Sequence, residues 1–267
     1  MTGVLVAQIT DPHVRRKGDL LHHMIHTGRE LRRCVAALNA RFPRPAFVVA
    51  TGDLVDRGKK KEYRRLRAIL AELEMPVYLL AGNHDDPDGL RNAFADHAYL
   101  PRTGPLCYAV EMRPLRLVAL DSTRGRKPGG ELDAQRLAWL DATLHEARDV
   151  PTLVAMHHPP FDVGVAPLDA KPLRGRESFE TIVRQHPQVV RVICGHLHLA
   201  AERRFGGTVA STAPSTSQQL VVEAVRGGTY GLRVERAAYA LHHWTGASLV
   251  TTIERTSEAP QRLHAVS

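Results

Sequence analysis

Polar turns that directly follow apolar runs are the feature that most constrains the fold of this chain. Five such turns stand along the sequence, in "TDPH", "GDLVDRG", "AGNHDD", "MHHPP" and "CGHLH". The runs before them are short, continuously apolar and rich in β-branched residues, which is typical of strands buried on both faces. We expect seven runs of this kind to be strands: residues 4–9, 46–50, 76–81, 115–120, 152–156, 189–194 and 208–212.

Segments with helical spacing lie between these runs. They cover residues 27–42, 59–74, 133–147 and 174–186. Strands that alternate with helices predict an α/β fold with a largely parallel sheet covered by helices. In open sheets of this kind ligands bind beyond the carboxyl ends of the strands. We therefore expect the five polar turns to meet at one site.

The C-terminal part of the chain has a different pattern. From about Ala213 to Glu254, short alternating runs predict antiparallel strands or hairpins. These hairpins either finish a sheet, form a small cap, or pair protomers in a homo-oligomer. Since no internal repeat or low-complexity linker is present, we expect residues 1–254 to form one domain, with 213–254 as a hairpin extension. Residues 255–267 are expected to be a loosely ordered tail.

Composition places the chain among ordinary soluble proteins. Of its 267 residues, 43% are hydrophobic and 24% are charged, and no run is long and apolar enough to span a bilayer. The N-terminus reaches Asp11 without the basic, apolar and small-residue order of a secretory signal. Three cysteines without close pairs argue against a disulfide framework. We therefore expect a cytoplasmic protein with no membrane partner.

The charge balance is strongly basic. The formal net charge is +8, and the densest basic run lies between Lys59 and Arg67. This run is either a solvated helix face or a surface that attracts phosphate-bearing molecules. Aromatic residues make up only 5% of the chain and do not alternate with the basic ones. Nucleic acid is therefore not an expected partner.

The five turns carry oxygen and nitrogen donors without any thiolate. Alternate residues of an extended segment point to the same side, so Asp11 with His13, and His196 with His198, can each bind as a pair. Such mixed donors suit Zn, Mn, Fe or Co. There are more donors than one tetrahedral ion needs, which predicts two divalent cations that share a carboxylate. The other candidate donors are Asp53, Asn83, His157 and His158, and glycine precedes Asp53, Asn83 and His196.

The order of DxH, GDxxD, GNHD, HH and GHxH resembles the calcineurin-like metallophosphoesterase family. The likeness is greatest to its bacterial phosphodiesterases for cyclic nucleotides or glycerophosphodiesters, and it runs from about Val4 to Pro214. The resemblance implies a two-layer β-sandwich flanked by helices, an αββα arrangement. It also implies a dinuclear-metal-dependent phosphodiesterase in which a metal-bound hydroxide attacks a small phosphodiester.

The resemblance further implies a role for each donor. Asp53 would be shared by both cations, and Asn83 and His84 would also bind the substrate. His84 would not be a ligand but would protonate the leaving oxygen. Whether His157 or His158 is the ligand of the "HH" pair is left open. The first cation would be held by Asp11, His13, Asp53 and His198, and the second by Asp53, Asn83, His157 and His196.

Two further residues of "GDLVDRG" have alternative interpretations. Asp56 is expected to orient His84 and raise its pKa, and the alternative is a turn acid or helix cap. Arg57 either contacts the phosphate of the substrate or is a surface arginine. Ala81 stands where the protein serine/threonine phosphatases have an arginine, which argues against a phosphoprotein substrate.

Other functions and other residues remain as alternatives. A nuclease or a phosphomonoesterase on the same scaffold is the second enzymatic interpretation. A scaffold that had lost its chemistry would lack ligands, whereas every ligand position here is occupied by a suitable residue. Histidines after the first motif either line the pocket or belong to a loop, and those near the C-terminus are expected to be strand residues; they are His22, His23, His26, His242 and His243.

Overall fold

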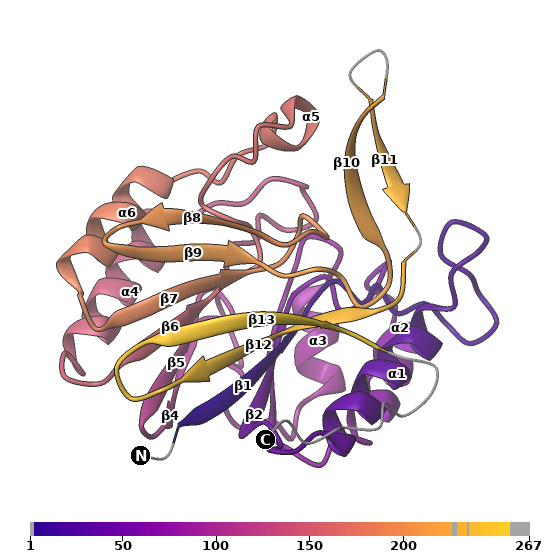
Figure 1. Ribbon diagram of the computed structural model, residues 1–267, viewed down its shortest axis with the longest axis horizontal. Coiled ribbons are helices and arrows are strands. Elements are labelled where there is room, and N and C mark those ends of the chain that lie inside the picture. The colour runs from indigo at the N-terminus through magenta and orange to yellow at the C-terminus, as the bar shows by residue number, and fades with distance from the viewer. Residues whose placement is uncertain (1–2, 226–228, 234, 257–267) are drawn as a thin grey trace, which may run out of the picture.

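Two mixed β-sheets lie between two groups of helices in the computed structural model, which describes residues 3–225, 229–233 and 235–256 (Figure 1). The first sheet has the strand order β13 (Leu249–Arg255), β12 (Ala238–Trp244), β1 (Val4–Ile9), β2 (Phe47–Thr51) and β3 (Val77–Leu80). The second has the order β4 (Tyr108–Met112), β5 (Leu115–Ala119), β6 (Thr152–Ala155), β7 (Val189–Cys194), β9 (Thr208–Thr212) and β8 (Ala201–Phe205). The predicted two-layer sandwich is confirmed.

Helices cover the outer faces of both sheets. On the side of the first sheet lie α1 (Thr27–Ala40), α2 (Lys60–Leu70) and α3 (Pro87–Ala93). On the side of the second lie α4 (Ala134–His145) and α6 (Arg176–Gln185), and α5 (Ala166–Asp169) is a single turn in the loop before α6. The predicted helices correspond to α1, α2, α4 and α6, each shorter than its sequence pattern.

Alternation along β5 shows how the layers pack. Leu117 and Ala119 join the apolar core that also contains strands and helices of the first sheet. Val118 points the other way, into a second core with Leu140 of α4 and Phe179 of α6. Because successive side chains of a strand point to opposite faces, β5 has one face against the first sheet and one against helices.

The seven predicted strands run parallel within their sheets, and this brings their carboxyl ends together. β1, β2 and β3 pair in parallel, as do β5, β6, β7 and β9. Antiparallel strands flank them, with β12 beside β1, β4 beside β5 and β8 beside β9. All seven predicted strands are present. The strands β4 and β8 were not predicted, because their outward residues are exposed and interrupt the apolar pattern.

The C-terminal segment contains two antiparallel strand pairs. β12 and β13 finish the first sheet beside β1. A separate hairpin of β10 (Gln219–Val225) and β11 (Thr229–Arg233) stands out from the sandwich in Figure 1. The tail was expected from residue 255, but β13 extends to Arg255, and residues 257–267 lie outside the described part. In the described ranges, every helix is too short or too polar to cross a membrane.

Candidate metal centre and active site

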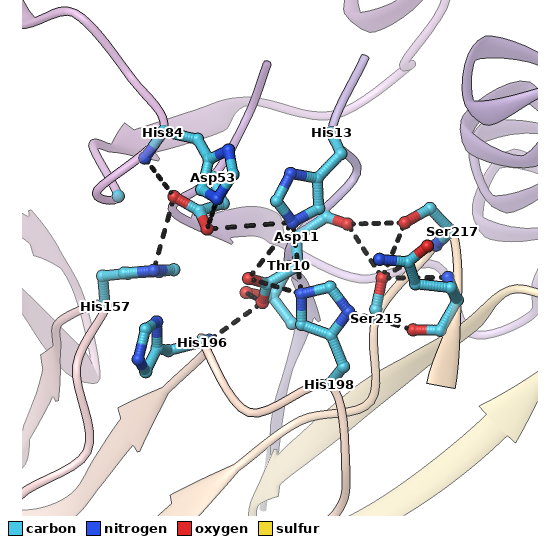
Figure 2. A network of polar contacts seen from close by, with 12 residues as sticks. Thr10, Asp11, His13, Asp53, His84, His157, His196, His198, Ser215 and Ser217 are labelled. Carbon is cyan, nitrogen blue, oxygen red and sulfur yellow. Dashed lines mark hydrogen bonds and ion pairs between the residues drawn. The ribbon is translucent and has the colours of Figure 1, made fainter. Parts of the chain in front are cut away.

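The polar turns of both sheets converge at one place, as predicted (Figure 2). Six of the seven predicted ligands offer donor atoms that lie within 4.8 Å of one another in overlapping groups of three. Asn83, the seventh, is buried in the turn after β3, between Gly82 and His84, which both approach Asp53. The six are Asp11, His13, Asp53, His157, His196 and His198.

The first predicted cation site is a cluster of facing oxygen and nitrogen atoms. Nε2 of His198 lies 3.2 Å from Oδ1 of Asp11 and 3.2 Å from Nε2 of His13. Nε2 of His13 lies 3.7 Å from Oδ2 of Asp53. Ligands about 2.0–2.2 Å from a common ion stand roughly 3–4 Å apart from each other. These four side chains therefore have the spacing of a cation site.

The second predicted site lies on the other side of Asp53. Oδ1 of Asp53 is 3.5 Å from Nε2 of His157, whose Nδ1–H donates to the carbonyl of Thr51 at 2.8 Å. This bond directs Nε2 toward Asp53. The ring of His196 lies 5.0 Å from that of His157. Asp53 thus faces one group of donors with each carboxylate oxygen, as a shared ligand would.

Buried atoms without partners test whether cations fit this site. Oδ1 of Asp11, Oδ1 of Asn83 and Nε2 of His157 are buried and have no hydrogen-bond partner among the described residues. Buried polar atoms are normally paired, so such atoms need an explanation. Two divalent cations would supply it, because each of these atoms belongs to a predicted ligand and can offer a lone pair, Nε2 of His157 after it loses its proton. The residues present fit the predicted pair of cations.

The backbone of the ligand turns is strained. Seven described non-glycine residues have a positive φ, and five of them are predicted ligands, with φ between 42° and 74°. Left-handed φ in such residues costs of order 1–3 kcal/mol each and clusters at functional sites. The five are Asp11, His13, Asp53, His196 and His198, and the other two are His22 and His23.

Hydrogen bonds that the sequence did not reveal fix two of the carboxylates. Thr10 donates its hydroxyl to Oδ2 of Asp11 at 2.6 Å, and the backbone N–H of His196 donates to the same oxygen at 3.0 Å. Oδ1 of Asp11 is thereby left for a cation. The backbone N–H of His84 donates to Oδ1 of Asp53 at 2.8 Å.

Asp85 joins the turns after β2 and β3 and was also missed. Its carboxylate accepts the backbone N–H groups of Leu54, Val55 and Gly82 at 2.9–3.2 Å, and the hydroxyl of Tyr63 at 3.1 Å. The fourth letter of "GNHD" is the signal that could have found it. Asp85 places the turn of Asp53 against that of Asn83.

Glycines permit the close approach of these turns, as expected. A Cβ at Gly82 would lie within 3.0 Å of three atoms of Asp53, including its backbone nitrogen. A Cβ at Gly195 would overlap the side chains of Thr10 and Asp11. Neither position tolerates a side chain without displacing a ligand.

His84 lies at the edge of the site with its ring accessible. Its side chain is 40% exposed, and Nε2 lies 3.9 Å from Oδ2 of Asp53. Nδ1–H donates to the backbone carbonyl of Asp56 at 2.8 Å, whereas the carboxylate of Asp56 is 3.9 Å away. That carboxylate lies closer to Arg15, at 3.2 Å. The direct hydrogen-bond partner of His84 is therefore the main chain of Asp56.

A basic cavity adjoins Asp56. It has a volume of about 440 Å³ and is lined by Arg15, Arg16, His23 and Arg57, among others. Nε of Arg57 lies 3.5 Å from the Asp56 carboxylate, and its side chain is 61% exposed. Arg57 thus stands beside the site and is open to solvent.

The remaining histidines of the sequence analysis occupy different environments. His26 is the N-cap of α1 and makes no capping bond with its side chain. His158 is buried, with Nδ1 2.9 Å from the hydroxyl of Ser122 and its ring 4.7 Å from that of His196. His242 and His243 lie in β12, as expected for strand residues.

The electrostatics of the cluster favour the cation-binding protonation state at some predicted ligands and oppose it at others. Burial alone would raise the pKa of Asp11, but His198 and His157 lower this pKa to about 2. Burial lowers the pKa of His196 to about 4. Burial would also lower the pKa of His157, yet Asp53 raises it to about 9. Asp11 is thus a carboxylate and His196 a neutral imidazole, while His157 must release a proton to bind a cation.

Comparison with known families agrees with this geometry. The sequence model of the calcineurin-like phosphoesterase family matches residues 4–200. The chain belongs to this family. Proteins of known structure share the fold: a dimetal phosphatase from Danio rerio superposes with a TM-score of 0.63 at 16% identity, covering 95% of this chain and 99% of the other. A purple acid phosphatase from yellow lupin seeds has a TM-score of 0.71 at 11% identity, covering 96% and 52%.

Curated family members resemble this chain over most of its length. A probable glycerophosphodiester phosphodiesterase, GpdQ, of Arcobacter nitrofigilis is 30% identical over 250 residues, which are 93% of this chain and 92% of that protein. The 3',5'-cyclic adenosine monophosphate phosphodiesterase CpdA of Escherichia coli K12 is 28% identical over 216 residues, or 81% and 77% of the two chains. The family resemblance that was inferred from the order of the motifs is confirmed.

Proposed function

We propose that this protein is a metal-dependent hydrolase of small phosphodiesters, with glycerophosphodiesters and cyclic nucleotides as the substrate classes. The observation that carries the proposal is the set of buried, unpartnered donor atoms on Asp11, Asn83 and His157 around the shared carboxylate of Asp53. Relatives whose names state these two activities align with most of the chain.

Each predicted ligand has a place in this proposal. Asp53 would be shared, with Asp11, His13 and His198 on one side and Asn83, His157 and His196 on the other. When bound, two divalent cations lower the pKa of a water molecule and offset the charge on the phosphoryl oxygens. Iron, manganese, zinc and cobalt all suit these donors.

His84 is proposed as the general acid. Its Nδ1–H is engaged by the Asp56 carbonyl, so Nε2 is the atom that faces the site. A proton on Nε2 would pass to the oxygen of the leaving alcohol as the phosphorus–oxygen bond breaks. Asp56 contributes by fixing the ring through its backbone carbonyl. The amide of Asn83 would also contact the phosphoryl group.

Arg57 is proposed to contact the phosphodiester from the rim of the basic cavity. Its guanidinium is exposed and is adjacent to Asp56, so it can reach an anionic substrate without breaking a buried ion pair. The other two arginines of the cavity, Arg15 and Arg16, would raise the local concentration of anionic substrates.

A comparison of substrates tests the proposed function. Protein loaded with Mn²⁺ would be assayed on glycerophosphoethanolamine, cyclic AMP, a bis-aryl phosphodiester and the matching aryl monoester, before and after chelation. We expect the diesters to be cleaved at least about tenfold faster than the monoester, and activity to disappear on chelation and return with Mn²⁺. Faster cleavage of the monoester would favour a phosphomonoesterase instead, and full activity after exhaustive chelation would refute the metal centre.

A further inference from the structure

Residues 215–218 connect β9 to β10 and lie beyond the part of the chain that the family sequence model matches. Ser215, Thr216 and Ser217 are almost completely buried, and Gln218 is buried as well. Buried hydroxyl groups normally have specific partners. Here the partners belong to the predicted first cation site.

Two hydroxyls of this segment bind the backbone of one ligand. Ser215 and Ser217 both donate to the carbonyl oxygen of Asp11, at 2.8 and 3.0 Å (Figure 2). The Ser215 oxygen accepts the backbone N–H of Ser217 at 2.9 Å, so its own proton is free for Asp11. The N–H of Thr216 also donates to the carbonyl of Thr10 at 3.0 Å.

The position of these two hydrogen bonds matters because they bind the backbone of Asp11, which has a φ of 50°. This left-handed conformation is unfavourable for a residue with a side chain, and the surrounding contacts have to enforce it. Two hydrogen bonds to the Asp11 carbonyl fix the peptide plane on the C-terminal side of this residue. They thereby hold the backbone from which the Asp11 side chain extends, while Thr10 and the His196 N–H hold its Oδ2.

The same segment also fixes a second ligand of that site. Nδ1–H of His198 donates to the carbonyl of Gln218 at 3.1 Å. The proton is then on Nδ1, and Nε2 is free at 3.2 Å from Oδ1 of Asp11. By contrast, the ring of His157 at the second site is oriented by Thr51 in β2.

We propose that residues Ser215–Gln218 position the ligands of the first cation site, and that the hydroxyls of Ser215 and Ser217 set the affinity of that site selectively. The inference rests on the proposed metal centre and adds two positioning residues to it. Loss of a hydrogen bond that orients a ligand typically reduces metal affinity about 10- to 100-fold. We expect a loss of this size at the first site only.

The test is a titration of metal-free protein with Co²⁺, in which binding is measured by calorimetry and by visible absorbance. His13→Asn and His196→Asn assign the two binding events to the first and second sites. Ser215→Ala, Ser217→Ala and the double variant should weaken the first event about 10- to 100-fold and alter its absorbance, with the second event within about threefold of wild type. Each single variant removes only one oxygen atom. The single variants therefore keep the test possible if the double variant does not fold.

Thr208→Val is the matched control. It removes a hydroxyl at the start of β9 that donates to the Val190 carbonyl of β7 at 2.8 Å, and it should leave both binding events unchanged. Equal weakening of both events in the serine variants would mean a general structural role and overturn the inference, as would an unchanged first event. A wild-type protein that binds no cobalt would overturn the metal centre, and this inference with it. Two normal events in wild type with unaffected serine variants would overturn the inference alone.

Discussion

Gly82→Ala is a sharp test of the active-site geometry, because the added methyl group would enter the space between two ligand turns. The new Cβ would lie within 3.0 Å of the backbone nitrogen, Oδ1 and Cγ of Asp53. Real Cβ atoms essentially never make such contacts, and two of these atoms belong to the shared carboxylate. To restore ordinary van der Waals separation, the turns of Asp53 and Asn83 must move apart by roughly 1 Å.

This displacement sets the size of the expected effect. Overpacking of a buried site costs about 1–3 kcal/mol of unfolding free energy. Functional groups need to be held within about 0.5 Å of their working positions, so a 1 Å shift of Asp53 should weaken both cation sites by at least about tenfold. The hydrogen bond from the His84 N–H to Asp53 would also be stretched from its present 2.8 Å.

Denaturant unfolding of metal-free protein measures the first effect, and cation titration measures the second. Gly129→Ala is the matched control, because its Cβ would meet no atom closer than 3.6 Å and its φ is not left-handed. That control should change stability by less than about 1 kcal/mol and leave both cation affinities intact. Normal cation binding by Gly82→Ala would refute the close packing of these two turns.

Three further variants test the acid, its neighbour and the stability of the first sheet. His84→Asn should slow cleavage of alkyl diesters about 10²- to 10⁴-fold but affect aryl diesters much less, since aryl leaving groups need no proton; equal losses in steady-state assays would refute the acid role. Asp56→Asn should lower turnover less than about tenfold, because the carbonyl that binds His84 remains and the carboxylate, 3.9 Å from Nδ1 of His84, is beyond hydrogen-bond distance; a loss of bound cations by elemental analysis would show that Asp56 is structural instead. Burial lowers the pKa of His242 to about 3, so the unfolded chain binds a proton below about pH 6.5 that the folded protein does not, and stability falls as pH decreases through this range. His242→Gln should therefore remove about 2 kcal/mol of the stability difference between pH 7 and pH 5 in urea unfolding, whereas the same change at exposed His243 should not.

The sequence predicted the parallel strands and the convergence of the polar turns for the same physical reason. Strands such as β2 are buried on both faces, so their composition alone identifies them. Parallel pairing then brings their carboxyl ends together whatever the sequence separation. The grouping of Asp11 with His198, 187 positions further along the chain, follows from this topology.

The partners of the ligands could not be predicted in this way. The residue that binds His84 through its main chain is Asp56, where the sequence suggested a carboxylate contact. Every residue has a backbone carbonyl, so the residue type at position 56 does not indicate this contact. Ser215 and Ser217 reach Asp11 only because β9 ends beside β7 in the second sheet. Likewise, the position of β12 beside β1 depends on pairing between distant strands.

Each cation site draws on both layers of the sandwich. Asp11, His13, Asp53 and Asn83 follow strands of the first sheet, whereas the histidines at 157, 196 and 198 follow strands of the second. A bound cation would therefore link the two sheets. Neither sheet alone carries all the predicted ligands of a site. Any substitution that shifts one sheet relative to the other, however far from the catalytic groups, would therefore lower the affinity of the protein for the cations.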